Sequence, residues 1–372
     1  MSIITYKFRL SPTKNQRVKL GNILEECRWL YNHFLEQRKT AWESDKKNLS
    51  CYDQMKLLPA LKRAHPSLKT VYAQSLQEVP YKIDRAFTSF FRRVKLGQTP
   101  GYPRFKGRDR LHSFSFPQAN YGYKLIGNKQ LRIAKVGHVK IKMHRTMPDA
   151  IKTCTITKSP SGKWYACFSC EVAKKLLKSN DKKVALDVGI KTFATLSNED
   201  VIPNPKFFKQ SQDKLAKAQK KLAKLEKGSV KRAKARKIVC RIHEKIANQR
   251  NNFCHQVSRA LVNNFGTIII EDIQVNKMIK KENLNVFNRS QTDTAWSLFF
   301  NFLTYKAEDA GRLLVKVNPA YTSQDCSTCG TRQLMPLSQR TYSCEACGLE
   351  LDRDYNAALN ILRLGTQSLA QA

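Results

Sequence analysis

Four cysteines in the last 50 residues have the spacing of a metal site. They form two Cys-x-x-Cys pairs, Cys326/Cys329 and Cys344/Cys347, and a glycine follows each pair. Each pair can offer two thiolates to one tetrahedral Zn²⁺ at about 2.3 Å, and the glycine lets the backbone turn around the ion. A disulfide or a chance arrangement is the alternative. Because four protein ligands leave no open coordination position, we expect one structural Zn²⁺ and no catalysis here.

Three carboxylates upstream and downstream of these cysteines could supply the chemistry. Asp187 interrupts an apolar run, Glu271 ends the short apolar strand expected at Ile268–Ile270, and Asp354 opens a helix that we expect to stop at Gly365. Taken singly, each acid would be read as a cap or turn residue. If the three converge, their charges need neutralisation. Two Mg²⁺ ions, with Mn²⁺ as a substitute, would do this while aligning a phosphodiester and a water.

The elements that would position these acids are readable in outline. Residues 182–197 predict a strand, a turn at Gly189 and a second strand. Upstream, Ile3–Leu10 alternates like a strand, and helical periodicity covers residues 16–39 and, with expected breaks at Pro59, Pro66 and Pro80, residues 55–95. Residues 98–110 read as a basic loop with interleaved aromatics. Residues 113–172 contain several short strands, which suggest a small barrel that closes with the first strand.

A basic segment lies between Asp187 and Glu271. Residues 206–250 contain 16 Lys and Arg against 3 Asp and Glu, a local net charge of +13. Leucines and isoleucines at helical spacing on either side of Gly228–Ser229, among them Leu215, Ile238 and Ile242, predict two helices joined by a turn. A charge run is ordinarily a solvated face. This charge density favours a track for nucleic acid.

Bulk properties point to the same class of partner. The 372 residues include 67 Lys and Arg and 29 Asp and Glu, a net charge of +38, which favours a polyanion as partner over a bare basic surface. No apolar run approaches the roughly 20 residues of a spanning helix, so we expect a cytoplasmic protein that does not enter a membrane. Eleven cysteines fit a reducing compartment. The absence of Walker and Rossmann glycine patterns disfavours ATP-driven and redox enzymes.

At this point the motifs can be compared with a family. The sequence resembles TnpB (OrfB), the insertion-sequence relative of type V CRISPR effector nucleases. The resemblance rests on LDVGIKTFATLS around Asp187, IIIEDIQVNKM around Glu271, NRSQTDTAW and YKAEDAGR between residues 288 and 312, NPAYTSQDCSTCG, and CGLELDRDYNAALNI. It implies that Asp187, Glu271 and Asp354 bind Mg²⁺ and that the four cysteines form a zinc ribbon. Asp352 shares the last motif, but the family's acid is the one at Asp354.

The resemblance also implies a multidomain α/β fold. Its core would be an RNase H-like (RuvC) nuclease domain at residues 176–320 and 350–365, with a basic helical insertion at 206–262 and a zinc ribbon at 321–349. An N-terminal wedge-like β-barrel at residues 1–12 and 98–175 would carry a helical recognition lobe at 13–97, and residues 366–372 would form a tail. Candidate nucleic-acid contacts are polar, aromatic or basic: Tyr72, Gln74, Gln77, Arg85, Arg92, Arg93, Arg104, Lys106, Lys231, Arg232, Arg236 and Arg241.

The activity implied by the resemblance is RNA-guided cleavage of DNA beside a short target-adjacent motif. The partners would be a guide RNA derived from the transposon end and double-stranded target DNA. We favour a monomer, although the sequence leaves the oligomeric state open. Two alternatives also remain open: a nuclease-silent regulator that only binds nucleic acid, and a transposase that acts on transposon ends.

Overall fold

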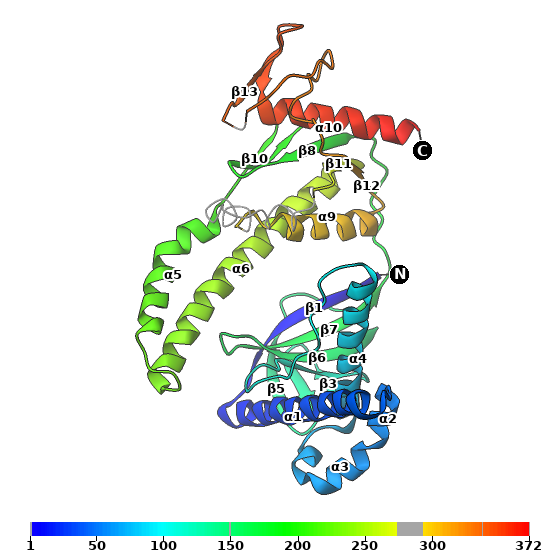
Figure 1. Ribbon diagram of the computed structural model, residues 1–372, viewed down its shortest axis with the longest axis vertical. Coiled ribbons are helices and arrows are strands. Elements are labelled where there is room, and N and C mark those ends of the chain that lie inside the picture. Colours follow the sequence, from blue (N-terminus) through cyan, green and yellow to red (C-terminus); the bar gives the residue numbers. More distant parts are fainter. Residues whose placement is uncertain (1, 149, 274–292, 337, 372) are drawn as a thin grey trace. The chain divides into compact units, whose positions relative to one another are not determined.

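The chain folds into two compact units, residues 1–173 and 174–372. The computed structural model describes residues 2–148, 150–273, 293–336 and 338–371. Two stretches quoted for the family resemblance, residues 274–278 and 288–292, therefore lie outside the described residues. Each unit has its own sheet (Figure 1). Each also has its own hydrophobic core.

The first unit is built on a seven-stranded antiparallel sheet in the order β2-β6-β7-β1-β5-β4-β3. Its strands are β1 (Ser2–Ser11), β2 (Ser113–Phe116), β3 (Tyr123–Ile126), β4 (Gln130–Ile133), β5 (Gly137–Lys142), β6 (Ile151–Lys158) and β7 (Trp164–Val172). β1 pairs with both β7 and β5, so the first strand joins the two halves of the sheet. The expected barrel is incomplete, since no pairing joins the edge strands β2 and β3 in the described part of the chain.

Helices α1 (Lys14–Asp45), α2 (Cys51–Lys56), α3 (Leu58–Ala64) and α4 (Ala73–Lys95), with the 3₁₀ turn η1 (Pro66–Thr70), lie between β1 and β2. Thr13 and Gln16 form a capping box that starts α1. The break expected at Pro80 is wrong, because this residue lies inside α4. Pro80 is buried beside Val79 and Ile83, and this packing outweighs the hydrogen bond that a proline cannot donate. Helices and sheet share one core.

The second unit contains a five-stranded sheet in the order β10-β9-β8-β11-β12. The strands are β8 (Lys183–Val188), β9 (Thr192–Leu196), β10 (Val201–Pro203), β11 (Thr267–Glu271) and β12 (Leu313–Val317). β8, β11 and β12 are parallel, whereas β9 and β10 run antiparallel as a continuation of β8. The strand–turn–strand predicted around Gly189 is confirmed.

Helices cover both faces of this sheet. Residues of α6 (Val230–Asn264) and α9 (Trp296–Ala310) pack against Val184, Ile268 and Ile270 on one face. α10 (Arg353–Ala370) packs against Ala185 and Ile269 on the other. Residues 268–270 of β11 therefore alternate between two covered faces, which explains why all three are isoleucine.

Two expectations about the C-terminus are wrong. Residues 366–370 belong to α10 and do not form a tail, and the helix passes through Gly365 without stopping. A Cβ on Gly365 would lie 2.4 Å from Ile269 Cγ2, so the glycine allows α10 to approach β11 closely. It is a packing residue and not a cap.

The predicted pair of basic helices is confirmed as α5 (Phe207–Ala223) and α6, with Gly228–Ser229 in the connecting turn. The stripe that joins them differs from the expectation at one position: Ile238 is exposed, and Val239 packs with Leu215 and Ile242. A strand pair, β13 (Thr341–Ser343) and β14 (Glu350–Asp352), precedes α10. None of the helices in the described ranges is both apolar and long enough for a membrane crossing.

Candidate functional site

Asp187 and Glu271 lie on the same face of the five-stranded sheet. Ala185 and Ile269 face α10, and side chains two residues apart along a strand share a face. Asp187 and Glu271 follow these residues by two positions and so project toward α10. Ile270 pairs with Leu186 in parallel register, which puts the next residue of each strand side by side. The neighbouring strands β8 and β11 thus place the two acids side by side at their carboxyl ends, which we call the acidic edge of the sheet.

Asp354 reaches this edge from the first turn of α10. Asp352 caps the helix, with its Oδ1 accepting the backbone N–H groups of Asp354 and Tyr355. The turn after β8 lies close to Asp354, because a Cβ on Gly189 would be 4.0 Å from Asp354 Oδ2. The structure therefore brings together all three acids singled out in the sequence. Asp352 is exposed and serves as the helix cap, whereas Asp354 is partly buried.

The electrostatics of this cluster favour a bound cation. Burial raises the pKa of Asp187 well above its usual range, and the charges of Glu271 and Asp354 raise it further. Burial also raises the pKa values of Glu271 and Asp354. Among the described residues the cluster's ion pair is that of Arg340 with Asp354, at 3.9 Å. Neighbouring buried carboxylates suit divalent cations, which prefer oxygen ligands and would offset the negative charge. Within the described ranges, however, only the four cysteines bring all their ligand atoms within 4.8 Å of one another.

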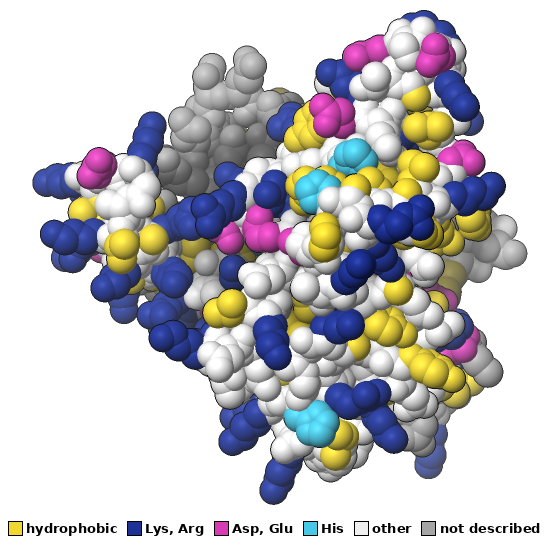
Figure 2. All heavy atoms as spheres, turned by 90° about the horizontal axis from the view of Figure 1, so that it is seen from below, with side chains coloured by type: hydrophobic (Ala, Val, Ile, Leu, Met, Phe, Trp, Pro, Cys, Tyr) yellow, Lys and Arg dark blue, Asp and Glu magenta, His cyan; other side chains and the backbone are white. Residues whose placement is uncertain are grey.

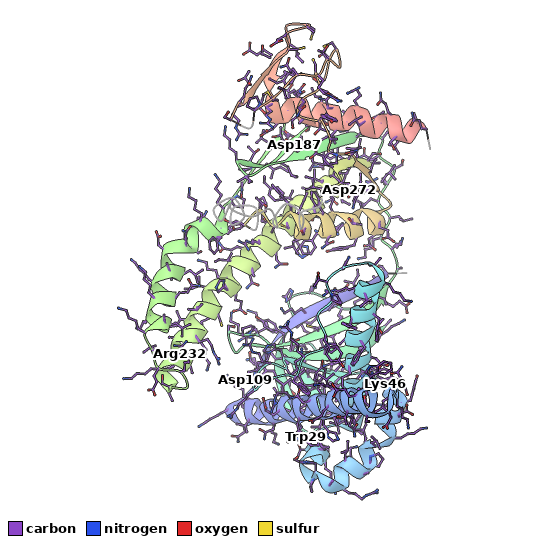
Figure 3. All side chains as sticks on the ribbon, in the orientation of Figure 1. Trp29, Lys46, Asp109, Asp187, Arg232 and Asp272 are labelled. Atoms are coloured by element: carbon purple, nitrogen blue, oxygen red, sulfur yellow. The ribbon has the colours of Figure 1, made fainter. Side chains whose placement is uncertain are left out.

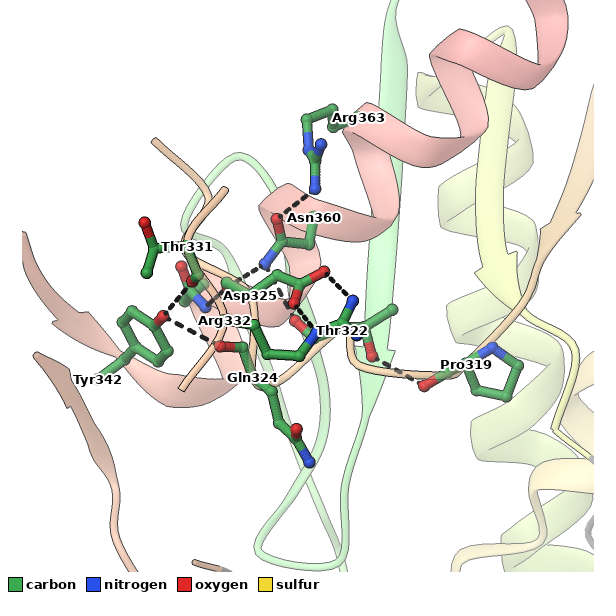
Figure 4. A network of polar contacts seen from close by, with 10 residues as sticks. Pro319, Thr322, Gln324, Asp325, Thr331, Arg332, Tyr342, Asn360 and Arg363 are labelled. Carbon is green, nitrogen blue, oxygen red and sulfur yellow. Dashed lines mark hydrogen bonds and ion pairs between the residues drawn. The ribbon is translucent and has the colours of Figure 1, made fainter. Parts of the chain in front are cut away.

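A polar network holds the segment between β12 and the first cysteine (Figure 4). The Thr322 hydroxyl donates to Glu271 Oε1 at 2.6 Å. The Asn360 side chain of α10 donates to the carbonyl oxygens of Thr322 and Asp325, and Asn356 also donates to that of Asp325. The sequence analysis missed these three residues. Their signal is weak, because a threonine in a loop and two asparagines on an otherwise apolar helix face are common.

The four cysteines converge as predicted. Their sulfur atoms all lie within 4.8 Å of one another. Cys326 Sγ is 3.7 Å from Cys347 Sγ, and Cys329 Sγ is 3.6 Å from Cys344 Sγ. Four sulfurs at about 2.3 Å from a tetrahedral Zn²⁺ would be about 3.8 Å apart, so these positions fit one zinc ion. The buried Tyr342 and Met335 pack against Cys326 and Cys344.

The candidate nucleic-acid residues of the first unit lie on α4 and on the segment after it. Gln77, Arg85, Arg92, Arg93 and Arg104 are exposed. Tyr72 is half-buried against Phe116, with ring centroids 5.9 Å apart, and Gln74 donates to Gln118. Both side chains therefore already make contacts within the first unit.

The segment at residues 98–110 is anchored to α1. The Asn32 side chain accepts the Lys106 N–H and donates to the Lys106 carbonyl, which also accepts from Arg28. The Lys106 ammonium lies 5.5 Å from the centre of the Tyr31 ring. This part of the predicted loop therefore has a fixed backbone.

On the basic hairpin, the four predicted residues differ in their surroundings. Lys231, Arg236 and Arg241 are exposed. Arg232, at the turn of the hairpin (Figure 3), donates from Nη1 to the carbonyl oxygens of Leu222 and Leu225. Figure 2 shows Lys and Arg side chains over much of the visible face, most densely on the projecting part at its left edge. The hairpin therefore presents exposed cations, while Arg232 also joins its helices.

Asp293 is a fourth residue that the sequence analysis missed. Its carboxylate is buried, accepts the backbone N–H groups of Phe208 and Lys209 at the start of α5, and pairs with Arg250 of α6 at 2.7 Å. It therefore fixes the base of the basic hairpin to the segment that precedes α9.

Three family models match parts of the chain. Residues 167–282 match a model described as a probable transposase of the OrfB IS605 type, and residues 296–361 match a Cas12f1-like TNB domain. Residues 1–47 match a helix-turn-helix model. In the structure this last range contains one strand, β1, and one long helix, α1.

Relatives match along nearly the whole chain. A Streptomyces pristinaespiralis protein named putative RNA-guided DNA endonuclease is 33% identical over 373 residues, which cover 98% of this chain and 90% of the relative. The putative RNA-guided DNA endonuclease InsQ of Escherichia coli K12 is 31% identical, with 98% and 93% covered. A cryo-EM structure of a Cas12f1–sgRNA–target DNA complex covers 97% of this chain and 99% of its own, at 16% identity and a TM-score of 0.38.

Proposed function

The chain belongs to the TnpB (OrfB) family, and on that premise we propose that it is an RNA-guided, metal-dependent DNA endonuclease. The convergence of Asp187, Glu271 and Asp354 at one edge of the sheet carries this proposal. Two full-length relatives named putative RNA-guided DNA endonucleases support the same activity.

Asp187, Glu271 and Asp354 would hold two Mg²⁺ ions, which when bound supply Lewis-acid polarisation of the scissile phosphate and a water of lowered pKa. The chain's own contribution is geometric and electrostatic. β8 and β11 hold two carboxylates in fixed register, and α10 adds the third from a capped first turn. Burial shields the carboxylates from water. A bound cation would therefore compensate charges that the solvent cannot.

We assign the remaining parts of the molecule by the same family membership. The second unit would be an RNase H-like (RuvC) core with the basic hairpin inserted between its acidic strands, and the four cysteines would hold one structural Zn²⁺. The first unit would combine the wedge and recognition regions. A mixed five-stranded sheet with helices on both faces supports the RNase H-like assignment.

The partners would be a guide RNA from the transposon end and double-stranded target DNA. Base pairing with the guide would select the target, while the protein would hold the duplexes by their backbones and read a short flanking motif. The net charge of +38 and the exposed cations of the hairpin support binding of a polyanion in this way.

Substitution of the acids tests the proposal. Asp187→Ala and Asp354→Ala are expected to abolish Mg²⁺-dependent cleavage while the protein still copurifies with its RNA, because binding relies on basic surfaces and not on the acids. Cleavage by either purified variant at the wild-type rate would rule out this assignment of the site.

A transposase remains the second candidate, since the family model over residues 167–282 is described as a probable transposase. Such an enzyme would also use an acidic metal site, but its preferred substrate would be the ends of the transposon. Binding and joining of transposon-end DNA in the absence of RNA would favour this candidate.

A further inference from the structure

We propose that Thr322 positions the Glu271 carboxylate, and that Asn360 ties this contact to the four-cysteine ribbon. The inference rests on the proposed metal-dependent nuclease, to which it adds a positioning residue. It also gives the ribbon a role in the acidic site: the state of the cysteine cluster would influence how well the acids bind metal.

The contact between Thr322 and Glu271 is short and shielded from water. The hydroxyl lies 2.6 Å from Glu271 Oε1, Thr322 is 3% exposed and Glu271 is 9% exposed. A hydroxyl that donates to a carboxylate in such surroundings stabilises the charged form and restricts the rotation of the carboxyl group. No hydrogen bond to Oε2 is recorded among the described residues, which leaves that oxygen for a cation. Thr322 thus selects one orientation of Glu271.

Thr322 is itself fixed from α10. Asn360 Nδ2 donates to the Thr322 carbonyl oxygen at 3.0 Å and to the Asp325 carbonyl oxygen at 2.6 Å. Asn360 is 1% exposed, so these bonds satisfy an amide that would otherwise be costly to bury. One side chain therefore spans the segment from Thr322 to Asp325, one residue before Cys326 (Figure 4).

Asn356 extends the clamp into the first cysteine pair. Its Nδ2 donates to the Asp325 carbonyl oxygen at 2.9 Å, and its Oδ1 accepts the backbone N–H of Ser327 at 2.9 Å. Ser327 lies between Cys326 and Cys329. Because Asn356 is only two residues from Asp354, the cysteine loop is tied both to the helix that carries Asp354 and, through Thr322, to Glu271.

A metal ion in the cysteine cluster would hold this loop in place. Without it, the bonds of the loop to Asn356 and Asn360 would have to hold the first cysteine pair by themselves. The first cysteine pair would then be held less firmly, and the alignment of Thr322 with Glu271 would weaken. The predicted consequence is weaker binding of Mg²⁺ at the acidic site and not the loss of a reacting group.

The decisive pair of variants is Thr322→Val and Thr322→Ser. Valine keeps the shape and removes the donor, whereas serine keeps the donor. Loss of a hydrogen bond that supports a metal ligand typically weakens metal affinity by about 10- to 100-fold. We expect the Mg²⁺ concentration for half-maximal thermal stabilisation of the full chain with its copurified nucleic acid to rise by about that factor in Thr322→Val. It should stay near wild type in Thr322→Ser, and both variants should retain one zinc per chain.

Zinc removal provides the second arm. Chelation of zinc from the wild type should raise the Mg²⁺ midpoint as Thr322→Val does, and chelation of Thr322→Val should raise it little further, because both changes act through one contact. If the stripped protein unfolds, the comparison of valine with serine still decides the matter.

A wild-type Mg²⁺ midpoint in folded Thr322→Val would overturn the proposal, as would an equal loss in the serine variant. The thermal readout does not depend on cleavage. If the wild type binds Mg²⁺ but cuts no DNA, the positioning role stands while the proposed nuclease function fails.

Discussion

At the scale of single residues, the site is a place where like charges are held together against their repulsion. The chain accepts this cost at Asp187, the carboxylate most affected by burial and by the charges of Glu271 and Asp354. The repulsion lowers the stability of the folded state, so removal of one charge or binding of a cation is expected to raise that stability.

The isosteric substitution Asp187→Asn tests this balance. Without added Mg²⁺ it should raise the thermal unfolding midpoint of the second unit, because a neutral amide replaces a buried carboxylate among like charges. Cleavage should fall by at least about 10³-fold, the order seen when one member of an interdependent catalytic set is removed.

The gain in stability should shrink when Mg²⁺ is added, since only the wild type then has three carboxylates to bind it. Asp200→Asn, a change at an exposed acid of the same unit, is the control and should leave the midpoint nearly unchanged. A lower midpoint for Asp187→Asn without added Mg²⁺ would contradict the account.

Asp187 and Glu271 stand out in the sequence because they interrupt or end apolar strands, whereas Asp354 was chosen over Asp352 only through the family resemblance. The four cysteines were predictable from their spacing. The supporting residues Thr322 and Asn360 were not, since a single threonine or asparagine carries no periodicity. Their roles depend on contacts between residues 38 and 51 positions apart in the chain.

At the scale of elements, α10 is the part that completes the site, and its close approach to the sheet depends on Gly365. The sequence suggested a helix stop at this glycine, because glycine commonly ends helices. Packing against Ile269 decides otherwise, and such a contact between distant segments leaves no local signal.

Gly365→Ala is expected to destabilise the second unit. Alanine favours a helix over glycine by about 1 kcal/mol, but the new methyl group would meet three Ile269 side-chain atoms at 2.4–2.9 Å. Overpacking of this kind costs about 1–3 kcal/mol, so the clash should dominate. Denaturant unfolding followed in the second unit measures the effect.

Gly21→Ala is the matched control, because Gly21 lies within α1 and nothing is found within 4 Å of a Cβ placed there. This change should stabilise the first unit by about 0.5–1 kcal/mol. Equal effects of the two alanines would show that Gly365 has no packing role.

The basic hairpin offers a comparison of two neighbouring cations. Lys231→Ala should weaken binding of nucleic acid and reduce the slope of log K against log salt by about 1 if it contacts one phosphate. Arg232→Ala should additionally lower the stability of the hairpin by about 1 kcal/mol, since its bonds to Leu222 and Leu225 carbonyls are lost. Salt titrations of affinity and thermal unfolding separate the two effects, and identical stability of both variants would refute the structural role of Arg232.

At the scale of the whole molecule, the pair of basic helices was predicted from the sequence and is confirmed, whereas the sharing of one core by helices and sheet in the first unit was not predicted. The sequence separated a helical lobe from a barrel because their periodicities differ. Buried residues of α1 and α4 nevertheless pack in the same cluster as those of β1 and β7. Tertiary packing therefore combines in one core two regions whose sequence periodicities differ.

Serine at Cys326 or Cys344 tests the ribbon as a structural unit. Both sulfurs are buried, and each belongs to a different Cys-x-x-Cys pair. Either change should lower zinc content and soluble yield together with cleavage, because a site of three thiolates binds zinc more weakly. A folded, zinc-loaded and fully active serine variant would contradict the prediction.

The most direct test of the central claim is to sequence the RNA that copurifies with the protein and then assay cleavage. The substrate would be a plasmid library that matches the 3′ end of that RNA beside randomised flanking bases, with Asp187→Ala as the inactive control. We predict a defined RNA and Mg²⁺-dependent depletion of one flanking motif by the wild type only. A defined RNA without cleavage would instead indicate a binding regulator. The absence of any defined RNA would contradict RNA guidance and favour the transposase.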